Sequence, residues 1–147
     1  MKTSFDKVTR DELIARIKRL SDMSVAQWGK MNVYQMAKHC RLWEEMIAGK
    51  THYKRGFIGL IFGQMALKDM LKTEKPLPQN MPSLKGLIIT DNGNVEEEKR
   101  KWIALLEELE HFSNFGFVHP FFGKMNKEEI GIMAYRHTDH HLRQFNC

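Results

Sequence analysis

Apolar residues recur at intervals of three and four along most of the chain, the spacing that places them on one face of an α-helix. The first such stretch follows Thr9-Arg10-Asp11-Glu12, in which Thr9 and Glu12 are spaced as in a capping box. Its apolar positions are Leu13, Ile14, Ile17 and Leu20. The pattern predicts a first helix that begins near Thr9 and ends near Ser21.

Asparagine marks the start of three later stretches. Asn32, with Gln35 in the reciprocal position, precedes an apolar stripe that continues to Gly49 and includes Val33, Met36, Ala37, Cys40, Trp43 and Ile47. Asn94 or the preceding turn starts a helix that ends near Phe112, with Trp102, Leu105, Leu106 and Leu109 on its apolar face. Asn126, with Glu129 three residues later, caps the predicted C-terminal helix.

The middle of the chain is less regular. Residues 56–73 predict a helix whose first half is apolar around nearly its whole circumference, which favours burial, at a subunit interface for example. Prolines at 76, 78 and 82 exclude regular structure, so residues 74–94 predict a long connection with a candidate extended piece at 86–90. No strand pair is predicted. The fold expected is an all-α four-helix bundle with a long crossover connection and a short additional helix or turn.

Length and composition favour one domain over residues 1–147. The chain is 42% hydrophobic, and its longest apolar run, Phe57 to Phe62, is too short to span a bilayer. Residues 1–11 lack the apolar core of a secretory signal. With Cys40 and Cys147 as the two cysteines, no disulfide framework is indicated. We therefore expect a cytoplasmic protein that does not bind membranes.

The net charge of +5 does not by itself indicate a nucleic-acid partner. Basic residues are interspersed with acidic ones, and the densest run, residues 99–101, directly follows three glutamates at 96–98. This pattern is typical of solvated helix faces, so we expect no nucleic acid as partner and a small molecule as substrate.

Histidines in the C-terminal helix give the strongest chemical signal. His137 and His141 are four residues apart on the stripe formed by Ile130, Ala134, His137, His141 and Gln144, so two imidazoles are expected on one buried face. Buried imidazoles need a metal, a carboxylate or a hydrogen-bond network. A helical pair alone is more often satisfied by carboxylates or solvent than by a metal. Asp139 and Glu44 are the candidate acceptors that would orient the imidazoles.

Several motifs together resemble a DUF-type branch of the DinB/YfiT-like superfamily. They are Trp28-Gly29-Lys30-Met31-Asn32, Gln35-Met36-Ala37-Lys38-His39-Cys40, His119-Pro120-Phe121-Phe122-Gly123-Lys124 and His137-Thr138-Asp139-His140-His141-Leu142-Arg143-Gln144. The resemblance covers most of the chain. It implies a four-helix bundle and a divalent metal bound by His39, His137 and His141. The superfamily's Arg-Gly-Gln after the last ligand is Leu142-Arg143-Gln144 here, so no role passes to Arg143.

Three imidazoles suit Zn²⁺ or Ni²⁺ best and also accept Fe²⁺ or Mn²⁺, and they leave a coordination position open. The resemblance implies a metal-dependent enzyme, with thiol-dependent S-transferase or isomerase chemistry that uses a low-molecular-weight thiol; hydrolysis is a further expectation. No catalytic residue is assigned. The alternative is a non-catalytic metal-binding module that forms a homodimer through Phe57 to Leu67. A nucleic-acid role has no recognition motif behind it.

The remaining candidate residues are expected to be structural. His52 and His111 are predicted at the surface, and His119 in a structural turn before Pro120. By the resemblance, His140 belongs to a doubled histidine with His141 and is not itself a ligand. Cys40 fits the apolar stripe of its helix and is expected in the core, not as a nucleophile. The tryptophans, Trp28, Trp43 and Trp102, are likewise expected mainly in the core, although they could line a pocket.

Overall fold

The computed structural model describes residues 1–147 and consists of five α-helices with one minimal β-hairpin. The helices are α1 (Lys7–Arg19), α2 (Val33–Ile47), α3 (Phe57–Leu71), α4 (Val95–Glu108) and α5 (Lys127–Gln144). Two 3₁₀ turns, η1 (Lys85–Leu87) and η2 (Leu109–His111), and the strands β1 (Val118–His119) and β2 (Gly123–Lys124) complete the fold. The strands are antiparallel, with Val118 opposite Lys124. The predicted all-α class is confirmed.

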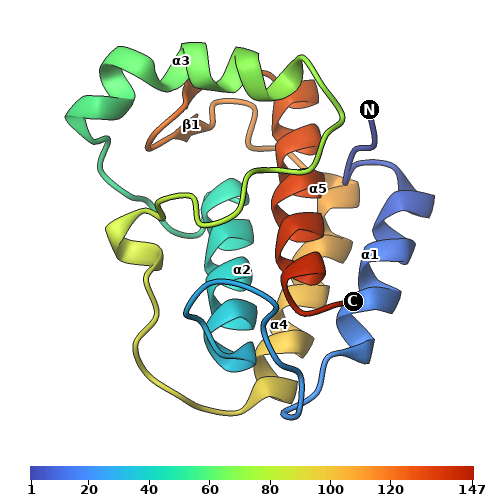
Figure 1. Cartoon of the computed structure of the whole chain (residues 1–147). Coiled ribbons are helices and arrows are strands. Elements are labelled where there is room, and N and C mark those ends of the chain that lie inside the picture. The colour runs from blue at the N-terminus through green and yellow to red at the C-terminus, as the bar shows by residue number, and fades with distance from the viewer.

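Four helices lie side by side, and the fifth crosses one end of them (Figure 1). The α4 helix packs against α1 and α2, and α5 packs against the same two helices from the other side. Their apolar stripes meet in one core that includes Cys40, Trp43 and Trp102, as the sequence predicts. The α3 helix instead contacts β2 of the hairpin. This arrangement brings the middle of α2 next to the C-terminal half of α5.

Three of the four predicted helix caps are confirmed. Asn32 and Asn126 form complete capping boxes with Gln35 and Glu129, and the Asn94 side chain accepts from the backbone N–H of Glu97. The predicted start of α1 at Thr9 is wrong. Asp6 caps this helix, since its carboxylate accepts from both the backbone N–H and the hydroxyl of Thr9 at 2.8 Å.

One local expectation for the middle of the chain is wrong, and another is not met within the single chain. The candidate extended piece at 86–90 begins in the 3₁₀ turn η1, which buries Leu87. The apolar first half of α3 is not buried within the single chain, because its small residues, not its large ones, face the hairpin. The hairpin itself was not predicted, since strands of two residues are too short to show an alternating pattern. No helix combines the length and apolar character needed to cross a membrane.

Candidate metal centre

Histidines from two helices converge where α2 passes α5. His39 comes from α2, and His137 and His141 come from successive turns of α5. Each offers one ring nitrogen, and these three nitrogens lie within 4.8 Å of one another. The Nε2 atoms of His39 and His137 are 3.0 Å apart. Because metal bonds to imidazole are about 2.0–2.1 Å long, one ion can reach both nitrogens.

A backbone carbonyl fixes the orientation of His39. The Nδ1–H of His39 donates to the carbonyl oxygen of Leu87 at 2.8 Å, which directs the Nε2 lone pair toward the other two imidazoles. Leu87 belongs to η1 and is buried. The long connection between α3 and α4 therefore positions a side chain of α2.

A glutamine one turn further along α5 orients His141. The Gln144 amide donates through Nε2 to the carbonyl oxygen of Trp28 at 2.8 Å, so its Oε1 is available to accept from the Nδ1–H of His141 at 2.9 Å. Gly29 lets the loop come this close. It has φ +81°, and a Cβ there would lie 2.6 Å from Nε2 of Gln144.

His137 has no acceptor for its Nδ1, and packing orients its ring instead. Its ring stacks on Trp43 with centroids 4.3 Å apart and an interplanar angle of 16°. Its Nδ1 is buried and has no hydrogen-bond partner. The stack fixes the plane of the ring, while Nε2 faces His39.

Burial keeps the three imidazoles neutral. Desolvation is the main cause that lowers the pKa of His39, His137 and His141, and the neighbouring imidazoles lower the pKa of His137 and His141 further. A neutral imidazole with its Nδ1–H donated elsewhere presents a free Nε2 lone pair, the form that binds a metal. The donor set of this cluster therefore fits a divalent metal of the zinc or nickel type.

The two carboxylates expected to orient the imidazoles do not do so. Asp139 accepts from Arg16 at 2.7 Å and from Arg143 at 2.8 Å on another face of α5. Glu44 is fully buried, its carboxylate accepts a hydrogen bond only from the Thr138 hydroxyl at 3.4 Å, and burial raises its pKa to about 8. A backbone carbonyl and an amide take their place. No sequence pattern identifies the Leu87 carbonyl as an acceptor, whereas Gln144 is on the predicted stripe of the C-terminal helix.

The other histidines lie outside the three-histidine cluster. His52 and His111 are exposed, as predicted. His119 is buried in the hairpin turn, where its Nδ1 accepts from the backbone N–H groups of Phe121 and Phe122 at 3.1 Å, and burial lowers its pKa to about 4. His140 is half-buried with its ring centroid 5.7 Å from that of Trp28. Neither His119 nor His140 therefore belongs to the three-histidine cluster.

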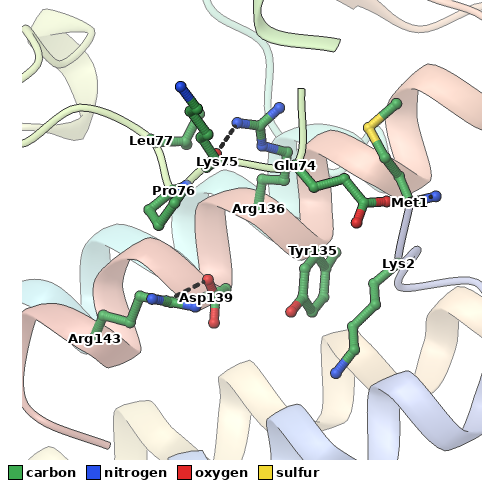
Figure 2. Close-up of a pocket in the computed structure, with 10 residues that line it drawn as sticks. All are labelled: Met1, Lys2, Glu74, Lys75, Pro76, Leu77, Tyr135, Arg136, Asp139 and Arg143. Atoms are coloured by element: carbon green, nitrogen blue, oxygen red, sulfur yellow. Dashed lines mark hydrogen bonds and ion pairs between the residues drawn. The ribbon is translucent and has the colours of Figure 1, made fainter. Parts of the chain in front are cut away.

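A surface cavity of about 180 Å³ lies on a different face of α5 (Figure 2). It is lined by charged and polar side chains, among them Lys75, Tyr135, Arg136, Asp139 and Arg143, and by none of the three histidines. Within it, Asp139 pairs with Arg143, and Arg136 donates to the Lys75 carbonyl oxygen. The cavity and the histidine cluster are therefore separate features of α5.

Comparison with known proteins identifies the family of the chain. The model of the family described as "Protein of unknown function (DUF1569)" matches residues 2–147. Searches of curated proteins and of solved structures returned no match. Because the family match covers nearly the whole chain, the protein belongs to the DUF1569 family.

Proposed function

We propose that His39, His137 and His141 bind one divalent metal ion and that the protein is a metal-dependent enzyme of the DinB-like type. The convergence of three neutral imidazoles carries this proposal, since two of them are oriented by Nδ1–H hydrogen bonds that leave Nε2 free. The motif resemblance to the DinB/YfiT-like superfamily supports the same ligand set. Zn²⁺ or Ni²⁺ is the expected ion, with Fe²⁺ and Mn²⁺ as alternatives.

Three protein ligands leave at least one coordination position for water or substrate. A bound divalent ion would lower the pKa of a coordinated water or thiol and would polarise a carbonyl group. Leu87 and Gln144 keep two imidazoles in the ligand tautomer, and Trp43 excludes water from one side of His137. We propose thiol-dependent S-transfer or isomerisation on a small-molecule substrate, with hydrolysis as the variant in which water replaces the thiol.

Burial of the cluster favours a second candidate, a non-catalytic metal module. His39 is 3% exposed and His141 is 7% exposed. A closed ion there would tie α2 to α5 and would mainly stabilise the fold. The two candidates differ in how the melting temperature responds to a chelator: a structural ion predicts a fall of many degrees on its removal, whereas an open catalytic ion predicts a smaller fall.

The deciding experiment is elemental analysis of untagged protein. We expect about one metal ion per wild-type chain and none in the triple variant His39→Ala, His137→Ala, His141→Ala. The matched control is the double variant His52→Ala, His111→Ala, which removes two exposed imidazoles and should keep its metal. Unchanged metal content in the triple variant, or none in the wild type after addition of Zn²⁺ or Ni²⁺, would refute the proposal.

Catalysis needs a separate readout. The His137→Ala variant should lose both its metal and any thiol-transferase turnover that the metal-loaded wild type displays. Metal-loaded wild type that is inactive with low-molecular-weight thiols and electrophiles, and that loses many degrees of melting temperature on chelation, would favour the non-catalytic module.

A further inference from the structure

The α3 helix carries the largest run of exposed apolar side chains in the protein. Six of them are between 48% and 74% exposed: Phe57, Ile58, Leu60, Ile61, Phe62 and Met65. With about 200 Å² of surface for each side chain of this size, their exposed parts amount to roughly 700 Å². The largest apolar patch of a typical monomer covers about 300–600 Å². This patch is therefore larger than a monomer usually leaves uncovered.

The orientation of α3 is fixed by its small residues. Gly59 and Gly63 face the backbone of the hairpin turn, and a Cβ on Gly59 would lie 2.6 Å from the carbonyl oxygen of Phe121. Gln64 donates to the carbonyl oxygens of Phe122 at 2.7 Å and Lys124 at 2.8 Å. Only glycine permits this close approach, so α3 cannot rotate to bury its large side chains against its own chain. In Figure 1, α3 accordingly lies across the end of the helix bundle with one side free.

We propose that the exposed face of α3 binds the same face of a second copy of the chain. The area agrees with a dimer, because a stable interface of standard size buries about 800 Å² on each partner. Ile61 is at the middle of the patch, between Phe57 and Met65 on successive turns. A two-fold axis near Ile61 would bring two identical faces together, as an isologous interface requires.

The charge distribution favours this partner over an anionic membrane. From Phe57 to Leu67 the helix carries no charged residue, so two copies can approach without like-charge repulsion. The charged residues within α3 are Lys68 and Asp69, whose opposite charges cancel. A helix that lies on a membrane surface usually carries an excess of lysine and arginine on its polar face. Here the buried side of α3 consists of Gly59, Gly63 and Leu67 and carries no lysine or arginine.

The test is the mass of the full chain in solution, measured by sedimentation over a wide concentration range. We expect wild type at twice the chain mass and the Ile61→Lys variant at the single-chain mass. The control is Val25→Lys, because Val25 is 72% exposed and lies outside α3; this variant should stay dimeric. Circular dichroism should show all three proteins equally helical, since neither side chain is buried in the single chain.

Two outcomes would overturn the proposal. Wild type at the single-chain mass over the whole range would exclude the dimer, and its co-sedimentation with phosphatidylcholine–phosphatidylserine vesicles would assign the α3 face to a membrane instead. A dimer that persists in Ile61→Lys would place the contact elsewhere. The result does not depend on metal, so metal-free protein should give the same masses.

Discussion

Gln144 and His141 are three residues apart on α5 and form a hydrogen bond of 2.9 Å between Oε1 and Nδ1. The same amide donates to Trp28 in the loop before α2. The Gln144 side chain therefore sets the tautomer of a proposed ligand and also binds the loop before α2. Loss of a partner of this kind commonly weakens metal affinity about 10–100-fold.

Replacing Gln144 by leucine should weaken metal binding by about 10–100-fold, because His141 loses the acceptor that holds its Nδ1–H. Competition with a chromophoric chelator measures the change. The control is Gln27→Leu, since the side-chain amide of Gln27 is exposed and donates only to the Val25 carbonyl oxygen. Equal affinities for the two variants would contradict the assigned role of Gln144.

The Glu44→Gln variant should change how stability depends on pH. Burial raises the pKa of Glu44 from 4.5 to about 8, so between these values the folded state keeps a proton that the unfolded state releases. The contribution of Glu44 to the free energy of unfolding is thus greatest below pH 4.5 and is lost as pH rises toward 8.

Urea unfolding of wild type and Glu44→Gln at several pH values tests this sign. The free energy of unfolding of wild type, relative to the variant, should fall by an amount on the order of a few kcal/mol as pH rises across that window. Parallel pH profiles for the two proteins would show that Glu44 titrates normally in the folded state.

Arg136 should hold the chain where it leaves α3. Its guanidinium donates to the carbonyl oxygens of Met70, Thr73 and Lys75, and the last of these bonds is drawn in Figure 2. The Arg136→Leu variant leaves these oxygens without their donor and should lose about 2–4 kcal/mol of stability.

Limited trypsin digestion gives a local readout of the same variant. Cleavage after Lys85, in the connection that Arg136 anchors, should become faster. Arg143→Leu is the matched control, because Arg143 is 53% exposed and Asp139 retains its bond to Arg16. Equal cleavage rates in both variants would mean that Arg136 does not restrain this segment.

Gly63→Ala should loosen α3 from the hairpin. The added Cβ would meet the carbonyl oxygen of Phe121 and lie 2.9 Å from its carbonyl carbon, and backbone atoms cannot move aside as a flexible side chain can. We expect a loss of about 1–3 kcal/mol in thermal or urea unfolding. Gly56→Ala at the start of the same helix meets nothing within 4 Å and should change stability by less than about 1 kcal/mol. Similar stabilities for the two variants would argue against tight packing at Gly63.

Much of the fold could be predicted because its signals are local. The Asn32 and Asn126 capping boxes each involve residues three apart, and the apolar stripes of α2, α4 and α5 repeat within a few turns. The exposure of the large side chains of α3, by contrast, depends on a contact between distant segments. The exposed face of α3 follows from the contact of its glycines with the Phe121 backbone, which helical periodicity cannot reveal.

For the candidate site, the sequence by itself determined the residue types and the pairing of His137 with His141, because four residues make about one helical turn. The resemblance added His39. Only the tertiary structure decided that α2 passes α5 at these residues, that the Leu87 carbonyl and not a carboxylate accepts from His39, and that Trp43 stacks on His137. These contacts join residues far apart in the chain, and their geometry depends on the packing of whole helices and loops.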